Sequence, residues 1–308
     1  MILIITHKQD FTADFVIEKL NNRGVKYYRF NCEDIASIDY SFENKGNFTL
    51  SINELNKYKS VWFRRTKLPD IVMTNDSEKL FVLSDYDSLF DNVFANINTE
   101  RWLSKPKFVY EAENKLLQLK IASEIGFKVP NTIVTQSKKR LNKFISDNNN
   151  NIIIKPIRQG RIKTNNSFKT VFTNKISNEI IDKLDDFDLT PCIFQEYIEK
   201  KYELRVTVVN DKVFSAKVDS QSLTETSIDW RKKKIPFVNY ELPAEIALKC
   251  VEILKKLNLS FGAIDLIKDI NDNYIFLEIN PNGQWAWIEM ETGLPISEEI
   301  INYLTAKS

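Results

Sequence analysis

Apolar residues near the N-terminus first follow the period of a strand, then that of a helix, and then that of a strand again. The three segments are residues 2–5, 11–22 and 25–30. A strand, a helix and a second strand in this order predict the start of an open α/β layer. Three further patterns extend it: a hairpin at about 38–53, a strand at 60–64 and a long helical stretch at 77–103. We therefore expect an N-terminal α/β domain over residues 1–105.

Lys105-Pro106 interrupts this pattern, and two smaller units are expected after it. Residues 106–192 are expected to form a small central α/β subdomain, with helices at 112–125 and 137–147 and a buried strand at 152–155. Over residues 193–308 strands dominate, accompanied by helices at 244–257 and 296–304. The fold class that follows is α/β (α+β), with an antiparallel sheet in the C-terminal subdomain.

Two C-terminal strands carry polar residues inside apolar runs. Asp265 lies in Ser-Phe-Gly-Ala-Ile-Asp-Leu-Ile, and Glu278 and Asn280 lie in Tyr-Ile-Phe-Leu-Glu-Ile-Asn-Pro-Asn-Gly, with Asp272-Asn273 as a tight turn between them. A hairpin would bring the two carboxylates face to face, and at about 4 Å they would repel by roughly 4 kcal/mol without a cation between them. Such oxygen ligands suit Mg²⁺ bound together with nucleotide phosphates. The alternative is a hairpin whose polar residues are solvated.

The overall composition excludes several classes of protein. The 308 residues hold 43 Lys plus Arg against 42 Asp plus Glu, so the formal net charge of +1 is too small to attract nucleic acid or an anionic membrane. No apolar run reaches the length of a membrane span. His7 is the single histidine, which argues against a zinc cluster and against histidine-centred nucleophilic catalysis. Cys32, Cys192 and Cys250 share no metal-ligand spacing and, without a secretory signal, indicate a reducing cytoplasm.

Three further groups of polar residues border predicted strands. Lys155 ends a buried strand, where its ammonium group needs an anion such as phosphate, although the segment could equally be a solvated loop. The backbone of Glu196, Tyr197 and Ile198 forms a hinge that could read an adenine edge. Glu203 could accept hydrogen bonds from ribose hydroxyls. Arg205, on the same face as Glu203, could steady a phosphoryl group, or the two residues could simply form a cross-strand salt bridge.

The order of these groups along the chain, from the lysine strand to the acidic hairpin, resembles the ATP-grasp fold. Four finer stretches resemble the graspetide synthetases, the ATP-grasp ligases that mature microviridin-type peptides. These stretches are Val61-Trp62-Phe63-Arg64-Arg65, Asp219-Ser220-Gln221, Ile228-Asp229-Trp230-Arg231 and Phe276-Leu277-Glu278-Ile279-Asn280-Pro281. The resemblance covers essentially the whole chain. The loop after Lys155, which is poor in glycine, departs from the family pattern.

The resemblance implies an ADP-forming ligase that phosphorylates a Glu or Asp side chain of a ribosomal precursor peptide. A Ser or Thr hydroxyl would then form an ester, or a Lys amine an amide. The implied ligands of ATP and Mg²⁺ are Lys115 and Lys155 for the α- and β-phosphates, Arg205 for the γ-phosphate, and Asp265, Glu278 and Asn280 for the metal. Arg231 would grip the acceptor carboxylate, with Asp229 orienting it or taking a proton from the nucleophile. Without the resemblance, the charged run at 228–234 would be a solvated loop.

The implied partner is the precursor peptide, bound through its leader and its core. An acidic helix at 177–188 could meet a basic residue of the leader or could be a solvated face. One of Arg64 and Arg65 is expected to reach the cleft and the other to be solvated, and Trp285 and Trp287 could line the peptide channel or pack the core. The helix at 77–103 could support a homodimer. Two other functions stay open: a RimK-like ligase that adds a free amino acid to a peptide or protein carboxylate, and a non-catalytic module that holds nucleotide or leader.

Overall fold

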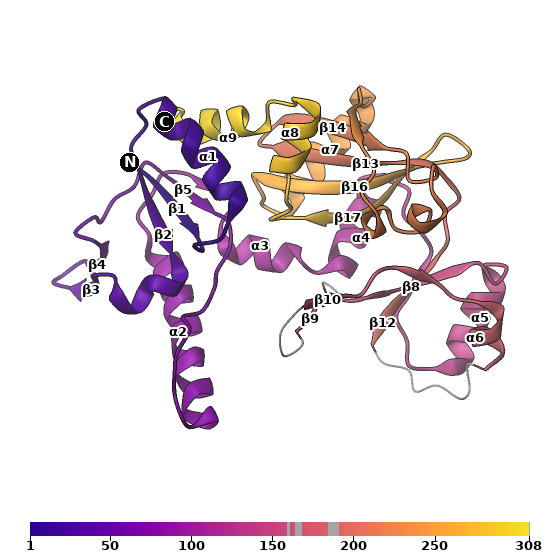
Figure 1. The fold of residues 1–308 in the computed structure, drawn as a ribbon, viewed down its shortest axis with the longest axis horizontal. Helices are drawn as coiled ribbons and strands as arrows, with labels where there is room; N and C mark the ends of the chain where they lie inside the picture. Colours follow the sequence, from indigo (N-terminus) through magenta and orange to yellow (C-terminus); the bar gives the residue numbers. More distant parts are fainter. Residues whose placement is uncertain (159–160, 164–167, 184–190, 308) are drawn as a thin grey trace.

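The computed structural model describes residues 1–158, 161–163, 168–183 and 191–307. Its N-terminal part is a parallel sheet of order β2-β1-β5-β6 (Figure 1), with strands at Tyr27–Asn31, Ile2–Thr6, Ser60–Phe63 and Trp102–Leu103. Strand β1 is buried along its whole length, as expected of a central parallel strand. Helix α1, Phe11–Asn22, begins at Asp10, whose carboxylate accepts the N–H groups of Thr12 and Ala13. The strand, helix and strand predicted from the sequence are confirmed.

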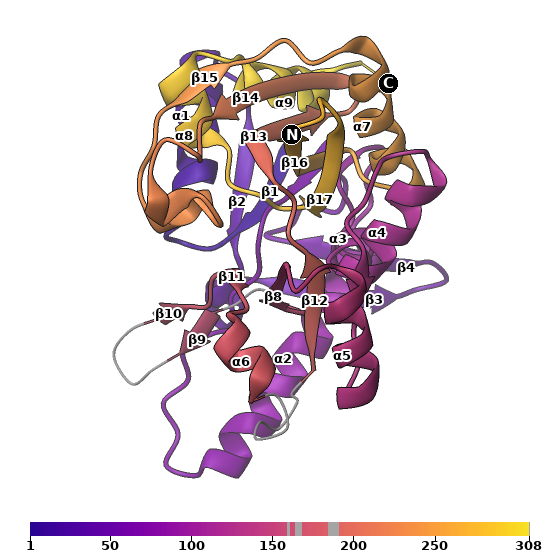
Figure 2. The ribbon, with the colours of Figure 1, turned by 90° about the vertical axis from the view of Figure 1, so that its right-hand side faces the viewer.

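Helix α2, Asp76–Asn96, extends away from this sheet in both views (Figures 1 and 2). The helix predicted over 77–103 is confirmed up to Asn96, but its predicted C-terminal end at residue 103 is wrong. After Asn96 the chain returns alongside β5, because the N–H groups of Tyr58 and Val61 donate to the carbonyls of Asn98 and Arg101, and the residues that follow become strand β6. The hairpin predicted at 38–53 is confirmed as β3, Tyr40–Asn44, paired with β4, Phe48–Ile52.

The helix predicted over 112–125 is α4, Lys115–Glu124, which begins three residues later than predicted, and a separate helix that the pattern did not predict, α3 (Pro106–Ala112), precedes it. Asn114 separates them, because its side chain accepts the N–H groups of Leu116 and Leu117 and so begins a new helix. Pro106 does not end an element. It occupies the first turn of α3, where a missing N–H is harmless. As a consequence, Lys115 is the first residue of α4.

We call the segment from β7 to β12 the central subdomain. Its antiparallel sheet has the order β11-β8-β12-β7, with strands at Asn174–Lys175, Ile152–Pro156, Cys192–Glu196 and Thr132–Ile133. Helices α5, Lys138–Asp147, and α6, Asn178–Asp182, share a small core with this sheet. A separate hairpin pairs β9, Arg161–Lys163, with β10, Phe168–Thr170. The helix predicted over 177–188 is described only as α6, because residues 184–190 lie outside the described part of the chain.

We call the segment from β13 to α9 the C-terminal subdomain, which is built on an antiparallel sheet of order β15-β14-β13-β16-β17. The strands are Phe237–Asn239, Lys212–Val218, Lys200–Val209, Phe261–Asp269 and Tyr274–Asn280. Helices α7, Ala244–Lys256, and α4 share one core with this sheet, whereas α8, Ala286–Thr292, and α9, Ile296–Thr305, share another with the sheet and α1. In both views the central subdomain lies to one side of the five-stranded sheet (Figures 1 and 2). Across the described residues, no helix combines the length and the apolar character needed to cross a membrane.

Candidate functional site

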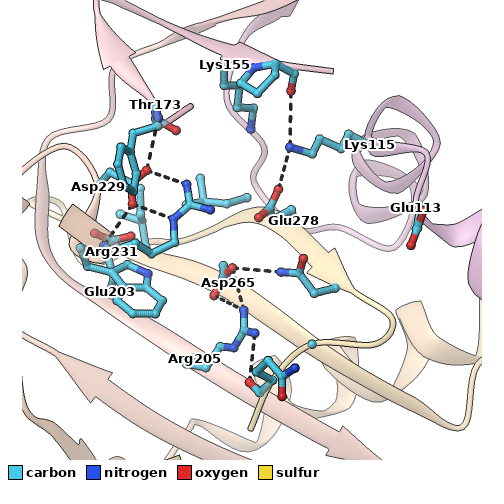
Figure 3. Close-up of a pocket in the computed structure, with 18 of the residues that line it drawn as sticks. Glu113, Lys115, Lys155, Thr173, Glu203, Arg205, Asp229, Arg231, Asp265 and Glu278 are labelled. Atoms are coloured by element: carbon cyan, nitrogen blue, oxygen red, sulfur yellow. Dashed lines mark hydrogen bonds and ion pairs between the residues drawn. The ribbon is translucent and has the colours of Figure 1, made fainter. Parts of the chain in front are cut away.

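A cleft of about 670 Å³ lies where the three parts of the molecule meet. All the residues assigned to the site from the sequence line it, and Figure 3 shows how most of them are arranged. The central subdomain contributes Lys155 and the hinge at 196–198, and α4 contributes Lys115. The C-terminal subdomain contributes the acidic hairpin, and the N-terminal part contributes Arg64 and Arg65. Residues that are far apart in the sequence are thus brought to one site.

The acidic hairpin has the expected geometry. Asp265 on β16 and Glu278 on β17 are direct cross-strand partners, and Glu278 and Asn280 share a face because they are two residues apart on one strand. Arg205, opposite Asp265 on the other neighbouring strand, donates from Nη1 to both carboxylate oxygens at 2.9 Å. Burial raises the pKa of Asp265, although Arg205 opposes this, and the charge of Glu278 raises it further.

Two lysines face the hairpin from the opposite wall of the cleft (Figure 3). The Nζ of Lys115 lies 3.2 Å from Oε2 of Glu278 and 3.5 Å from the carbonyl of Pro156, so it bridges the C-terminal and central subdomains. Burial would raise the pKa of Glu278, but Lys115 and Lys155 together lower it to about 2. Burial lowers the pKa of Lys155 to about 8. Glu278 is therefore ionised, while Lys155 lacks a strong enough anionic partner to keep its ordinary pKa.

The donor set of the hairpin fits Mg²⁺. Asp265 and Glu278 offer carboxylate oxygens, and Asn280, whose Nδ2 lies 3.4 Å from Oδ2 of Asp265, adds an amide oxygen. Within the described ranges, no group of three or more His, Cys, Asp or Glu side chains is placed to hold a metal. A metal here would thus take only a few protein ligands and complete its shell elsewhere, which is how Mg²⁺ is usually held beside nucleotide phosphates.

The hinge at 196–198 is held in place by main-chain contacts. The N–H groups of Glu196 and Tyr197 donate to the carbonyls of Asn131 and Asn151, at 3.0 and 2.8 Å. The carboxylate of Glu196 accepts the amide of Asn131 at 2.7 Å. A ligand edge would therefore have to be read by the remaining groups of the hinge, including the backbone of Ile198.

Glu203 is paired with a residue that the sequence did not indicate. Its Oε1 lies 2.6 Å from the Nζ of Lys200, and Arg205, on the same strand, bonds Asp265 instead, so a salt bridge between Glu203 and Arg205 does not form. Residues three apart on a regular strand point to opposite faces, but the register of β13 shifts between Lys200 and Tyr202. Burial raises the pKa of Glu203, and Lys200 partly offsets that rise. The irregularity in β13 has no signal in the hydrophobic pattern.

Asp229 precedes and caps a short 3₁₀ turn, Trp230–Lys232, which contains Arg231. Arg231 donates to the carboxylate of Asp229 from its backbone N at 3.1 Å, from Nε at 2.8 Å and from Nη2 at 2.6 Å. A fourth donor is the backbone N–H of Thr173, at 3.2 Å. Burial raises the pKa of Asp229, but the hydrogen bonds from Arg231 outweigh it and leave the pKa below its usual value. The side chain of Asp229 is buried, whereas that of Arg231 is 47% exposed to the cleft.

Both arginines of the N-terminal wall line the cleft, so the expectation that one would be solvated is wrong. Arg64 is only 1% exposed, and its Nε lies 3.4 Å from Oδ2 of Asp10, too poorly aligned for a hydrogen bond. Arg65 is half-buried. Both belong at the cleft because β5 ends at its edge.

The two tryptophans after the hairpin have different positions. Trp285 is fully buried in the core beneath α8, whereas Trp287 lines the cleft. The ring of Trp287 packs against Trp230 and Phe237, with centroids 5.8 and 5.0 Å away. This aromatic cluster attaches the turn, which contains Arg231, to the five-stranded sheet.

Comparisons with known proteins agree with this architecture. Residues 112–304 match the RimK-like ATP-grasp domain, and residues 1–109 match the MvdD pre-ATP grasp domain. The macrocyclase MdnC of Microcystis aeruginosa MRC, solved with precursor peptide MdnA, is 27% identical with a TM-score of 0.86 over all of both chains. A RiPP-associated ATP-grasp ligase of Chryseobacterium gregarium, solved with ADP and a leader and core peptide, is 30% identical with a TM-score of 0.87, over 100% of this chain and 97% of that one.

A curated relative matches over a smaller part of its length. The uncharacterized protein MJ0776 of Methanocaldococcus jannaschii is 27% identical over 223 residues, which are 71% of this chain. The match spans about half of that protein, 51% of its length.

Proposed function

Because the chain belongs to the RimK-like ATP-grasp family and begins with a MvdD-type pre-ATP-grasp domain, we propose that it is an ATP-dependent peptide macrocyclase. The enzyme transfers the γ-phosphoryl group of ATP to a Glu or Asp side chain of a ribosomal precursor peptide and releases ADP. A Ser or Thr hydroxyl, or a Lys amine, of the same peptide then attacks the acyl phosphate, loses its proton and expels phosphate. The observation that carries this proposal is that two lysines face the acidic hairpin across one cleft, beside the Asp229–Arg231 pair.

Lys155 and Lys115 are the cations best placed for the α- and β-phosphates. Lys155 is buried beside the cleft with a pKa of about 8, and a phosphate next to it would raise that pKa back toward its ordinary value. Arg205, fixed by its two bonds to Asp265, would brace the γ-phosphate. A Mg²⁺ ion held by Asp265, Glu278 and Asn280 would neutralise charge on the transferring group. The hinge at 196–198 would bind adenine, and Glu203, kept in place by Lys200, would bind the ribose hydroxyls.

Arg231 is the residue that would grip the peptide carboxylate. Its Nε and Nη2 are used by Asp229, which leaves Nη1 for a substrate. Of the two roles expected for Asp229, the geometry favours orienting Arg231, because a carboxylate whose pKa lies below its usual range is a weak base at neutral pH. Catalysis then rests on positioning and charge neutralisation and needs no enzyme nucleophile.

The test is incubation of the protein with its precursor peptide, ATP and Mg²⁺, followed by mass spectrometry of the peptide. We expect the loss of one water mass per ring, with one ADP formed for each. Arg231→Ala should abolish ring formation but keep nucleotide affinity. Lys232→Ala, which removes the same charge from the same turn at an exposed position, is the matched control and should behave like the wild type. An unchanged peptide mass with ATP unspent contradicts the proposal.

Two other functions give different results in this experiment. A RimK-like ligase that adds a free amino acid would raise the mass of its substrate and would need that amino acid in the mixture. A non-catalytic module would bind nucleotide or leader without consuming ATP. The geometry does not favour the module, because Lys155, Asp265, Glu278 and Asn280 all face one cleft.

Further expectations belong to this proposal. They are a division of the chain near residues 105 and 192, a reducing cytoplasm, a leader contact at α6 and a homodimer. Cys32 and Cys250 are buried free thiols and Cys192 is partly buried, which suits a reducing compartment. Leu80 and Phe81 on α2 are 68% and 67% exposed, which suits an interface with a second copy. Light scattering of the purified protein tests the dimer, and a mass of one chain contradicts it.

A further inference from the structure

The carboxylate of Asp229 joins two subdomains. On one side it holds the backbone N, Nε and Nη2 of Arg231. On the other side it accepts the backbone N–H of Thr173 at 3.2 Å. Asp229 is 5% exposed, so the accepting carboxylate is largely removed from water, which strengthens the hydrogen bonds it accepts. Figure 3 shows Thr173 above Asp229 and Arg231 beside it.

The turn that carries Asp229 belongs to the C-terminal subdomain. Trp230, between Asp229 and Arg231, packs its ring against Phe237 of β15 at a centroid distance of 5.1 Å. The carbonyl of Ile228 accepts the Nζ of Lys200 on β13 at 3.2 Å. These contacts fix the turn to the five-stranded sheet, so any motion of the central subdomain would leave Asp229 and Arg231 in place.

Thr173 belongs to the central subdomain. It immediately precedes β11, and Asn174 of β11 pairs with Ile154 of β8, next to Lys155. The N–H group of Thr173 and the ammonium group of Lys155 are therefore carried by the same small sheet. A nucleotide that draws Lys155 toward the hairpin also brings Thr173 toward Asp229.

We propose that Asp229 is a positioning residue whose bond to Thr173 makes the grip of Arg231 on the peptide carboxylate depend on closure of the central subdomain over ATP. With Thr173 in place, four donors fix the carboxylate and Arg231 presents Nη1 to the substrate. When the central subdomain moves away, water replaces the Thr173 N–H and only the donors of Arg231, whose side chain is 47% exposed, hold the carboxylate. The inference rests on the proposed function and deepens it, because it makes nucleotide and peptide binding cooperative.

The test measures the affinity of the precursor peptide with and without a non-hydrolysable ATP analogue. In the wild type the analogue should tighten peptide binding, and by linkage the peptide should tighten analogue binding by the same factor. Thr173→Pro removes the N–H group, and we expect it to lower this coupling by about tenfold, the usual effect of one hydrogen bond to a charged group. Thr173→Ala keeps the N–H group and should keep the coupling. Because proline can also disturb β11, an ester in place of the Thr173 amide provides a second variant that removes only the donor.

The outcomes separate this inference from the proposed function. Wild-type coupling in both the proline and the ester variants overturns the role of Thr173, as does a wild type that binds both ligands without coupling. A wild type that binds no nucleotide overturns the proposed function and this inference with it. Asp229→Asn should raise the KM for peptide more than it lowers kcat and should leave the shape of the kcat–pH profile unchanged. Loss of the acidic limb of that profile would make Asp229 the general base and overturn the positioning role.

Discussion

Nucleotide binding should weaken as the pH rises through 8, because Lys155 loses its proton in that range. Burial in β8 lowers the pKa of Lys155 to about 8, and only the charged form attracts phosphate. From this value, about nine-tenths of the protein carries the charge at pH 7 and about one-tenth at pH 9. If bound phosphate keeps the lysine protonated across this range, the nucleotide should bind about tenfold more weakly at pH 9 than at pH 7.

Isothermal titration calorimetry with a non-hydrolysable ATP analogue and Mg²⁺ measures both the affinity and the protons exchanged. At pH 8 about half of the protein should take up a proton on binding, so the apparent binding enthalpy should change with the ionisation enthalpy of the buffer. At pH 6.5 that dependence should nearly vanish. The affinity and the proton count are independent readings of the same titration.

Two variants decide whether Lys155 is the responsible group. Lys155→Met should bind weakly and with an affinity that no longer falls between pH 7 and pH 9. Lys212→Met removes an exposed lysine of β14 and should keep the wild-type profile. The reasoning is refuted by a wild type with a flat profile and no proton uptake, or by a Lys155→Met protein that keeps the full pH dependence.

Three other changes test the rest of the site and its support. Glu278→Gln should abolish ring formation measured by mass spectrometry while the melting temperature stays within a few degrees, because it removes the charge of a proposed metal ligand without changing the size of the side chain. Gly283→Ala should lower turnover, because the new Cβ would lie 2.6 Å from the Cβ of Ala263 and 2.8 Å from Nη2 of Arg205; overpacking of this kind costs about 1–3 kcal/mol in chemical denaturation. Asp10→Ala leaves a buried guanidinium at Arg64 unpaired and should destabilise the fold by roughly 3–5 kcal/mol. Burial raises the pKa of Asp10, but Arg64 and the hydroxyl of Thr6, with smaller contributions from other neighbours, together outweigh it and leave the pKa lowered. The stability that Asp10 contributes is therefore present above pH 4 and should be lost in wild-type melts as the pH falls below that value.

The acidic hairpin could be predicted from the sequence because its signal is local. Asp265 and Glu278 each interrupt an apolar run, and a two-residue period then determines which side chains share a face. The turn between the two strands carries Asp272 at a φ of 65°, a conformation that Asp and Asn tolerate. Local pattern and cross-strand geometry agree here, and the predicted pairing is confirmed.

Contacts that depend on irregular backbone could not be predicted in this way. Lys200 meets Glu203 only because the register of β13 shifts, and Thr173 meets Asp229 only because two subdomains approach each other. The helix predicted over 77–103 extends too far past Asn96, because the apolar spacing continues beyond that residue. In the structure, hydrogen bonds to the segment that contains β5 hold the following residues in extended conformation. In each case tertiary contacts override a local periodicity that gives no hint of them.

The distribution of charge in the cleft explains why substrate, nucleotide and metal would have to assemble together. Four acidic residues of the cleft already have a cationic partner: Glu278 with Lys115, Asp265 with Arg205, Glu203 with Lys200 and Asp229 with Arg231. A triphosphate alone would compete with these carboxylates for the lysines, and a divalent cation alone would compete with the basic side chains for the carboxylates. When both arrive, Lys115 can turn from Glu278 to phosphate while Glu278 turns to the metal, so no buried charge is left unpaired. These four carboxylates are therefore paired when the cleft is empty and would be paired again when it is full, and the partly assembled states between them would be disfavoured.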